Sequence, residues 1–320
     1  MTFFWAKKSK FISILTLALT VFLSLPSVHA KDDKFEFIVL GDTAYRGAKD
    51  YPAYQSLIEK INSRQPSFTV HIGDIWGVGP CTDENYERIK QFFDSYDQPV
   101  ILTPGDNEWT DCHPVIMGGF DPVERLQKLR SSYFSTAYSM GKTKLPVIRQ
   151  ADVSDHKDFV ENLRWEKQGV LFVTIHVVGS ANNLVPHSET VFKEFFHRDK
   201  ANLAWIDDSF RIAIEEKFKA VVILFHGNMF DFDKAPFKKT NKSIRIGAER
   251  FGKPVLLVHG DSHLFLVDKP YFEEDGELGQ PEFDNVTRLQ VYGPQTVRAV
   301  RVSVEPSTPW VFGFTPFYEQ

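Results

Sequence analysis

The chain has 320 residues, of which 42% are hydrophobic, with 37 basic and 42 acidic side chains. This length is sufficient for one large domain with a substantial core. The formal net charge of −5 at pH 7 excludes the strongly basic surface of a typical nucleic-acid-binding protein. We therefore expect no nucleic-acid partner.

The N-terminal residues have the pattern of a secretory signal peptide. Lysines within positions 7–10 precede an apolar stretch over 11–25, and a small-residue cleavage pattern ends at Ala30. The apolar stretch is shorter than the roughly 20 residues that a membrane-spanning helix needs, although an uncleaved anchor is the alternative. We predict a signal peptide over 1–30, a single domain over 31–320, periplasmic or secreted localisation, and no membrane span after cleavage.

Strand-like and helix-like patterns alternate after the leader. The apolar, β-branched runs Phe35–Leu40, Phe68–Ile72 and Val100–Thr103 are typical of strands. Between them, apolar residues recur at helical spacing in a segment that begins at Pro52 and in Tyr86–Tyr96. The β-α-β-α-β order predicts a parallel sheet with right-handed crossovers.

The remaining elements follow from the same patterns. We expect helices in Asp121–Arg130, Ser188–Lys219 and Lys238–Phe251, and strands over Leu171–Val178 and Ala220–Phe225. We also expect a hairpin of Val255–Val258 with Leu264–Val267, and a last pair of strands formed by Arg288–Tyr292 and Val297–Val304. The stretch Leu145–Arg164 reads as an irregular surface excursion, and the acidic stretch Glu273–Glu282 as a mobile loop.

Polar side chains follow several of these strands at the point where each strand ends. They are Asp42, Asp74, Asp106, Asn107, His226, Asp261 and His263. Carboxylate, amide and imidazole groups are ligands for divalent metal ions, and converging carboxylates repel one another unless a cation or a proton intervenes. Each residue alone is more commonly a turn former or a structural histidine, so the hypothesis depends on their shared position. We interpret His71, His176 and His259, which lie within strands, as structural.

The two cysteines lie shortly after two of these strand ends. Cys81 follows Asp74, and Cys112 follows Asp106. If the two loops are adjacent, an oxidising compartment would join Cys81 to Cys112 by a disulfide; a pair of free thiols is the alternative.

The order and spacing of these motifs resemble the calcineurin-like metallophosphoesterase superfamily, which includes the purple acid phosphatases. That family has Asp-x-His, Gly-Asp, Gly-Asn-His-Asp/Glu, a lone His and Gly-His-x-His. The corresponding stretches here are Asp42-Thr43-Ala44, Gly73-Asp74, Gly105-Asp106-Asn107-Glu108, His226 and Gly260-Asp261-Ser262-His263. The resemblance implies an α/β fold, a four-layer α/β/β/α sandwich of two mixed sheets flanked by helices.

The resemblance also implies a set of metal ligands. One ion would be held by Asp42, Asp74 and His263, and the other by Asp74, Asp106, His226 and Asp261, so that Asp74 bridges the two. Several residues depart from the family pattern. Ala44 and Asp261 replace histidines, and Asp106 replaces the asparagine of the Gly-Asn-His-Asp/Glu motif. Carboxylates in place of nitrogen ligands favour Mn²⁺ or Mg²⁺ over Zn²⁺ or Fe.

A further departure affects the proposed chemistry. Asn107 stands where the family has the histidine that protonates the leaving group, and we name His113, just past Cys112, as a substitute acid. Tyr45, one position after Ala44, could supply a phenolate, as the resemblance to purple acid phosphatases implies. We predict a metal-dependent phosphoesterase that cleaves phosphomonoesters or diesters, including nucleotide-type substrates, by attack of a metal-activated hydroxide. The alternative is a catalytically degenerate member of the same fold that binds a ligand, a metal or a partner.

Overall fold

The computed structural model describes residues 1–2, 33–77, 79–184, 188–230, 235–271 and 284–318. Contacts divide the chain into the units Met1–Asp32 and Asp33–Gln320, and the fold is that of the second unit. The predicted signal peptide and the predicted loop over 273–282 lie outside the described residues, apart from the first two positions.

One sheet contains the strands that precede the three Gly-Asp turns. Its order is β12-β11-β1-β2-β3, with β1 (Phe35–Leu40), β2 (Thr69–His71), β3 (Val100–Leu102), β11 (Ala299–Val304) and β12 (Phe312–Phe317). The first three strands are parallel, as predicted, whereas β11 and β12 are antiparallel to their neighbours. Leu40 is paired with His71, and His71 with Leu102. This register aligns the ends of the three strands, so the turns that follow them emerge side by side.

The second sheet contains the remaining strands. Its order is β4-β5-β6-β7-β8-β10-β9, with β4 (Ile148–Arg149), β5 (Leu163–Lys167), β6 (Val170–Thr174), β7 (Ala220–Leu224), β8 (Val255–His259), β9 (Leu266–Asp268) and β10 (Val286–Gln290). The central strands β6, β7, β8 and β10 are parallel, and the edge strands are antiparallel. Both sheets are therefore mixed, as predicted.

Several sequence-based expectations were wrong in detail. The expected hairpin does not form, because β9 pairs with β10 rather than with β8, and Arg288 on β10 donates to Asp268 on β9 at 2.8 Å. The stretch expected to be irregular contains β4, the short helix α4 (Gln150–Val153) and the start of β5. The expected last pair of strands does not form either, because β10 lies in the second sheet beside β8 and β9, whereas β11 lies in the first sheet beside β1 and β12. Strand β12 was not anticipated.

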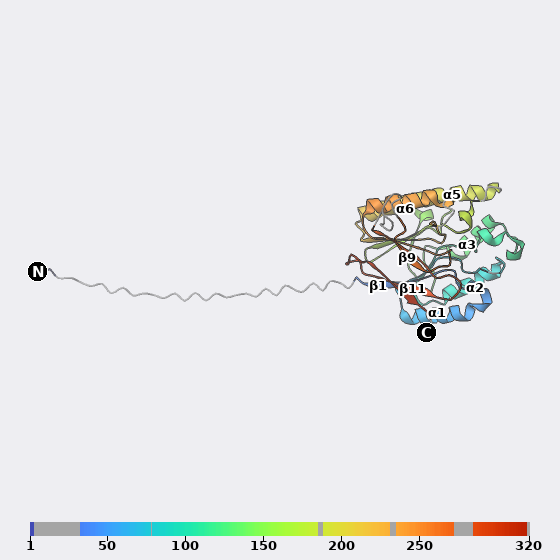
Figure 1. The fold of residues 1–320 in the computed structure, drawn as a ribbon, viewed down its shortest axis with the longest axis horizontal. Coiled ribbons are helices and arrows are strands. Elements are labelled where there is room, and N and C mark those ends of the chain that lie inside the picture. The colour runs from blue at the N-terminus through green and yellow to red at the C-terminus, as the bar shows by residue number, and fades with distance from the viewer. Residues whose placement is uncertain (3–32, 78, 185–187, 231–234, 272–283, 319–320) are drawn as a thin grey trace. The chain divides into compact units, whose positions relative to one another are not determined.

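The longer helices surround the two sheets (Figure 1). They are α1 (Tyr51–Arg64), α2 (Asp83–Asp94), α3 (Pro122–Tyr133), α5 (Glu189–Glu215) and α6 (Lys238–Phe251). The buried face of α1 consists of the apolar residues that the helical spacing predicted. Figure 1 shows α5 and α6 on one side of the molecule and α1 on the opposite side, with the strands between them.

Alternation along the strands divides the apolar core into two layers. On β7, Val222 and Leu224 pack between the two sheets, whereas Val221 and Ile223 pack toward α5 and α6. Between the sheets, the ring of Phe172 contacts those of Phe37 and Phe68 at centroid distances of 5.5 and 5.1 Å. A parallel strand buried on both faces is expected to be apolar throughout, which explains why β7 reads as a continuous apolar run.

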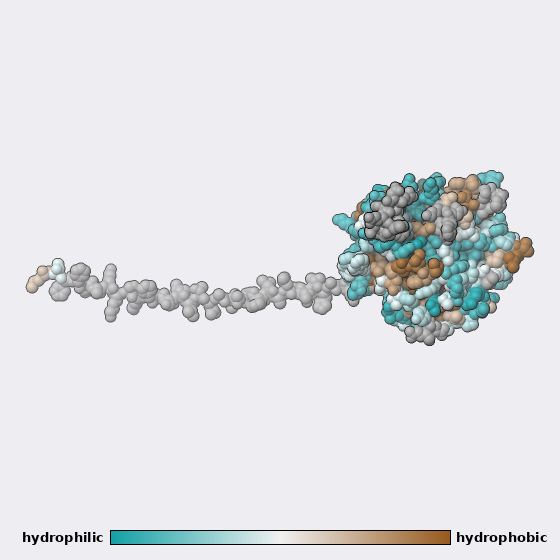
Figure 2. Space-filling view, viewed as in Figure 1, coloured by the Kyte–Doolittle hydropathy of each residue, from teal (hydrophilic) through white to brown (hydrophobic). Residues whose placement is uncertain are grey.

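The outer surface is mostly polar on the face seen in Figure 2, with an apolar patch near the region where Figure 1 labels β9. Leu264 and Val267 are 63% and 39% exposed. Within the described parts of the chain, no helix combines the length and apolar character that crossing a bilayer requires.

Candidate metal centre

The candidate centre forms where strand ends of both sheets converge. Asp42, Asp74 and Asp106 follow β1, β2 and β3 of the first sheet, and His226 and Asp261 follow β7 and β8 of the second. Backbone hydrogen bonds connect the turns within each sheet. The Asp42 amide donates to the Gly73 carbonyl at 3.1 Å, and the Gly260 amide donates to the His226 carbonyl at 3.0 Å.

Among the residues that the structure describes, two groups of side chains lie close enough to hold a cation each. One contains Asp42, Asp74 and His263, and the other contains Asp74, Asp106 and His226, with one ligand atom from each residue within 4.8 Å of the others. Asp74 belongs to both groups. The structure therefore brings together five of the six predicted metal ligands, and Asp74, the predicted bridging ligand, is common to both groups.

Asp261, the sixth predicted ligand, lies beside the second group. Its Oδ2 accepts from the Asn228 amide at 2.9 Å. A Cβ atom at Gly179 would lie 2.4 Å from Asp261 Oδ1 and 2.7 Å from Asp106 Oδ1, so both oxygens approach the same glycine. Gly179 is thus required for the close approach of these two carboxylates, and Asp261 directs one oxygen toward the group.

His226 is oriented by the protein backbone. It is fully buried, and its Nδ1 lies 2.8 Å from the Ile72 carbonyl, where it donates its proton. Its Nε2 then faces Asp106 Oδ1 at 3.0 Å and Asp74 Oδ1 at 3.3 Å. Metal-binding histidines commonly have one ring nitrogen fixed in this way by a carbonyl or carboxylate. His226 therefore presents Nε2 to the carboxylates in the orientation that a metal ligand needs.

Among the described residues, several buried polar atoms of the centre make no hydrogen bond of acceptable geometry. They are both carboxylate oxygens of Asp42, Asp106 Oδ1, Glu108 Oε2 and His226 Nε2. Nevertheless, His226 Nε2 lies 3.0 Å from Asp106 Oδ1, and His263 Nε2 lies 3.3 Å from Asp42 Oδ1. A buried polar atom without a partner costs about 1–3 kcal/mol, and more when it is charged. These atoms converge on the same region, and a cation would satisfy them.

The pKa values of the cluster show how strongly these groups interact. Burial, followed by the charges of Asp106 and Glu108, raises the pKa of Asp74 well above its usual value. Burial opposes ionisation of His226, but the carboxylates of Asp74 and Asp106 outweigh it and raise its pKa. The same imidazole outweighs burial at Asp106, whose pKa is lowered. The cluster thus retains protons that a divalent cation would displace.

Four of the predicted ligands have a backbone conformation that L-residues rarely adopt. Asp42 and Asp74 both have φ of 51°, Asp261 has 73° and His263 has 59°. This left-handed conformation costs about 1–2 kcal/mol for a residue with a Cβ, although Asp tolerates it better than most. Such conformations cluster at functional sites, which agrees with the location of all four at one centre.

Asn107, a predicted catalytic residue, lies within this centre. Its Nδ2 donates to Asp74 Oδ2 at 2.7 Å, and its side chain also hydrogen-bonds the hydroxyl of Tyr45. The ring of Tyr45 contacts that of His263 at 5.1 Å between centroids. Burial and then the charge of Asp74 raise the pKa of Tyr45 to about 12. Both effects favour the neutral phenol of Tyr45 over the phenolate.

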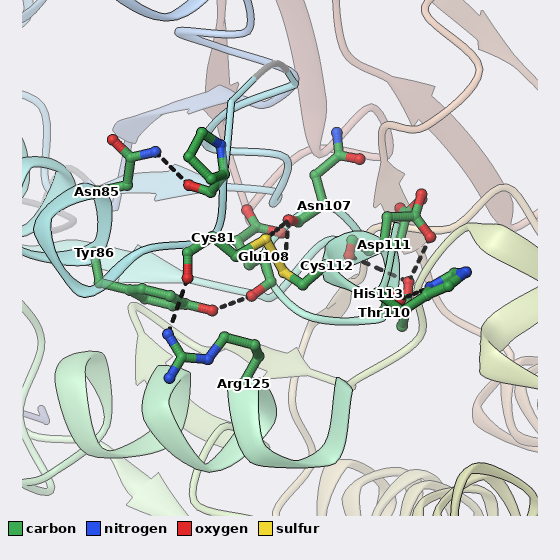
Figure 3. Close-up of a disulfide and its surroundings, with 12 residues drawn as sticks. Cys81, Asn85, Tyr86, Asn107, Glu108, Thr110, Asp111, Cys112, His113 and Arg125 are labelled. Atoms are coloured by element: carbon green, nitrogen blue, oxygen red, sulfur yellow. Dashed lines mark hydrogen bonds between the residues drawn. A yellow bond between two sulfur atoms is a disulfide. The ribbon is translucent and has the colours of Figure 1, made fainter. Parts of the chain in front are cut away.

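The predicted disulfide joins Cys81 to Cys112 (Figure 3), with a Cα–Cα distance of 5.7 Å. Both sulfur atoms lie beside the carbonyl oxygen of Asn107, at 3.5 and 3.6 Å. The disulfide therefore lies directly against the backbone of the Asn107 turn and fixes its position.

His113, the second predicted catalytic residue, is exposed beyond the disulfide. Its Nδ1 lies 2.9 Å from the Thr110 carbonyl of its own loop. Figure 3 shows Thr110, Asp111 and His113 together, on the side of the disulfide opposite Asn85 and Arg125. The structure thus places Asn107 in the cluster and His113 in the neighbouring loop.

Glu108 and the strand histidines have structural roles. Glu108 Oε1 accepts from the Ile75 amide at 2.6 Å, so this carboxylate connects the Asp74 turn to the Asp106 turn. His71 contacts the Thr43 carbonyl at 2.7 Å, and burial lowers its pKa to about 4. His176 contacts Glu161 at 2.8 Å and His259 contacts the Gly260 carbonyl at 3.0 Å.

Sequence reasoning missed one contact to the cluster. The hydroxyl of Ser180 lies 3.0 Å from Asp106 Oδ2 and 2.8 Å from Asp111 Oδ2. Ser180 follows Gly179 after the expected strand Leu171–Val178, which is the same strand-end signal that marked the aspartates. It was not selected because a serine after a glycine is an ordinary turn sequence.

Comparison with known proteins supports the fold. No family model matches the sequence, and no curated protein matches it. The structure is similar to that of a dimetal phosphatase from Danio rerio, with a TM-score of 0.53 and 10% identity, over 89% of this chain and 99% of that one. This is the calcineurin-like metallophosphoesterase fold.

Two further structures are similar to this chain at lower TM-scores. GAP50, the anchor in the inner membrane complex of Plasmodium, has a TM-score of 0.49 and 9% identity, over 90% of this chain and 89% of that one. A 5'-nucleotidase from Candida albicans has a TM-score of 0.43 and 13% identity, over 88% of this chain and 50% of that one. The chain thus spans half the length of the nucleotidase.

Proposed function

We propose that this protein is a metal-dependent phosphoesterase that binds two divalent ions and hydrolyses phosphomonoesters or diesters. The observation that carries the proposal is the pair of buried Asp/His groups that share Asp74. One group contains His226 with Nδ1 engaged by the Ile72 carbonyl and Nε2 directed at two carboxylates. These groups lie at the strand ends of a metallophosphoesterase fold.

The side chains present fit such ions. The carboxylate oxygens of Asp42, Asp106 Oδ1 and His226 Nε2, which make no hydrogen bond of acceptable geometry, are donors of the kind that divalent cations require. We assign Asp42, Asp74 and His263 to one ion, and Asp74, Asp106, His226 and Asp261 to the other. The excess of carboxylates over imidazoles favours Mn²⁺ or Mg²⁺ over Zn²⁺ or Fe. Ions bound there supply Lewis acidity to a phosphoryl oxygen and lower the pKa of water.

The chain's own residues then determine which esters react. The amide of Asn107 can donate a hydrogen bond to a phosphoryl oxygen, but it cannot deliver a proton to the leaving group at neutral pH. General acid assistance is worth about 10²–10⁴ in rate. We therefore propose that esters with acidic leaving groups are cleaved most readily, and that His113 is the first alternative proton donor.

The cellular setting is part of the same proposal. The Cys81–Cys112 disulfide is typical of oxidising compartments, and the leader pattern over 1–30 favours export. We propose that residues 31–320 act as one exported domain on small phosphoesters, including nucleotide-type substrates.

The test is metal analysis together with hydrolysis. The purified chain beginning at Lys31 should retain about two divalent ions per molecule after dialysis against Mn²⁺, and it should cleave nitrophenyl phosphate or bis-nitrophenyl phosphate. Asp74→Asn should lower metal content at both sites and lower the rate at least about 100-fold. Asp94→Asn, an exposed carboxylate on α2, is the control and should behave as wild type.

Two results would contradict the proposal in different ways. If the chain binds neither Mn²⁺, Mg²⁺, Zn²⁺ nor Fe²⁺, the metal assignment is wrong. If it binds metal but cleaves neither ester with any of these ions, the protein is a binding member of the fold instead of an enzyme. Loss of metal in Asp261→Asn but not in Asp74→Asn would show that the bridging residue is misassigned.

A further inference from the structure

A recess of about 380 Å³ lies next to the candidate metal centre. Its walls come from the loop after Trp109, the start of α3, the turn η4 (Ser180–Asn183) and the start of α5. The polar lining includes Thr110, Asp111, His113, Asp121, Ser180 and Asn183. Pro122 and Val191 supply an apolar part of the wall. The recess therefore combines a polar and an apolar surface, as small-molecule sites commonly do.

Ser180 separates the recess from the metal centre. Its hydroxyl lies 3.0 Å from Asp106 Oδ2 on the side of the centre and 2.8 Å from Asp111 Oδ2 on the side of the recess. Asp106 belongs to the second of the two candidate metal groups. A molecule bound at that group thus has the recess as its immediate neighbour, one serine side chain away.

The wall formed by η4 is held in a fixed conformation. All four residues of the turn have positive φ, from 45° at Ser180 to 60° at Asn183. Arg198, fully buried on α5, donates to Asn182 Oδ1 at 2.6 Å and to the Asn182 carbonyl at 2.8 Å. Asn183 donates to Glu194 of the same helix at 2.8 Å. Because the long helix supports the turn, the recess is preformed.

The charge of the lining selects the kind of group that would bind. Among the described residues that line it, Asp111 and Asp121 are the carboxylates and His113 is the one basic side chain. Asp121 Oδ1 accepts from the Glu124 amide at the start of α3, so its Oδ2 remains available to a ligand. Two carboxylates attract a cation and repel a leaving group with a further phosphate or carboxylate, while Pro122 and Val191 can contact methylene groups.

We propose that this recess is the leaving-group subsite of the enzyme and that, among alkyl phosphoesters, it selects those of small amino alcohols, such as ethanolamine. The ammonium group of the alcohol lies between Asp111 and Asp121, and its carbon chain contacts Val191. This inference rests on the proposed function for the reaction itself, but the recess and its charge are independent of it.

The test compares two alkyl esters that differ in charge. With Mn²⁺, the wild-type kcat/KM for phosphoethanolamine should exceed that for glycerol 2-phosphate. Asp121→Asn retains the oxygen that caps α3 and removes one charge, so it should lower the ratio of the two kcat/KM values about tenfold, the usual effect of losing a charged hydrogen-bond partner. Asp111→Asn should lower it in the same direction, whereas Asp94→Asn should leave the ratio unchanged.

A binding measurement separates this inference from the proposed function. Nuclear magnetic resonance titration of the intact chain with ethanolamine alone should show binding that Asp121→Asn weakens, whether or not any ester is cleaved. Hydrolysis of aryl esters with no ethanolamine binding would leave the enzyme assignment intact and overturn the subsite. A wild-type preference for glycerol 2-phosphate, or an unchanged ratio in both aspartate variants, would also overturn it.

Discussion

At the scale of single residues, Asn107 connects the proposed metal chemistry to the choice of substrate. Its amide donates to Asp74, which belongs to both candidate metal groups, and its backbone carbonyl contacts the disulfide. The side chain is 7% exposed, so its position is fixed by these neighbours. A group in this position can orient a phosphoryl oxygen but cannot supply a proton.

We therefore expect Asn107→His to change substrate preference. The imidazole can protonate a poor leaving group, so the variant should cleave alkyl esters such as glycerol 2-phosphate faster than wild type, by up to about 10²–10⁴. Nitrophenyl esters should gain less, because their leaving groups need no proton. The measurement is the chemical-step rate for both ester types, with Asn107→Ala as the control that removes the amide without adding an acid.

The outcome for wild type is also informative. If wild type cleaves alkyl and aryl esters at similar chemical-step rates, another group donates the proton, and His113→Ala becomes the next variant to measure.

At the scale of elements, the turn η4 has a strained left-handed backbone and lies beside the candidate metal centre. Ala181 is exposed and has φ of 53°. A left-handed conformation costs an alanine about 1–2 kcal/mol, whereas glycine adopts it without this steric cost. The support for the turn comes from Asn182 and Asn183, which bond to α5, rather than from the side chain of Ala181.

We expect Ala181→Gly to raise the free energy of unfolding by about 0.5–1 kcal/mol. The matched control is Ala53→Gly, an exposed alanine in the first turn of α1, where the same substitution should lower the free energy of unfolding, by up to about 1 kcal/mol. Urea denaturation of the two variants beside wild type measures both. Equal destabilisation by both substitutions would show that η4 does not have this left-handed conformation in solution.

The elements also show what the sequence could predict. The β-α-β-α-β segment and the turns at Asp42, Asp74 and Asp106 were predictable, because an apolar run that ends at Gly-Asp is a local signal and parallel strands end at a common edge. The pairing of β9 with β10 was not, since it depends on a strand that follows more than fifteen positions later. Ser180 was missed because its role depends on a left-handed turn that Arg198 supports from a distant helix.

At the scale of the whole molecule, the candidate metal centre depends on the two sheets being held in a fixed position relative to each other. The first sheet contributes Asp42, Asp74 and Asp106, and the second contributes His226 and Asp261. The aromatic contacts between the sheets, such as Phe68 with Phe172 at 5.1 Å, therefore fix the site as well as the core. Residue letters at strand ends could predict which side chains converge. They could not predict the convergence of two different sheets, which is a property of the tertiary packing.

A buried ion pair connects helix α3 to the second sheet near this junction. Glu161 is fully buried and accepts from Arg130 of α3 at 2.6 and 3.0 Å. It also accepts from His176, just beyond β6, at 2.8 Å. Burial favours the neutral acid, but the charge of Arg130 and the hydrogen bond from His176 outweigh it and lower the pKa of Glu161 to about 2.

The free energy of unfolding should therefore decrease at acidic pH, as Glu161 becomes protonated. Its pKa is lower in the folded state than in the unfolded state, where it is near 4.5, so its contribution is complete above pH 4.5 and is lost as the pH falls toward 2. The lost free energy of unfolding should amount to about 3 kcal/mol.

Glu161→Gln should be less stable than wild type by about 3–5 kcal/mol at pH 7, because it leaves Arg130 without its partner. The variant should also lose less stability than wild type between pH 4.5 and 2. Urea denaturation across this range, with the exposed Glu166→Gln as the control, measures both effects. An acid-induced decline that is the same in Glu161→Gln as in wild type would show that other carboxylates control the acid stability of the fold.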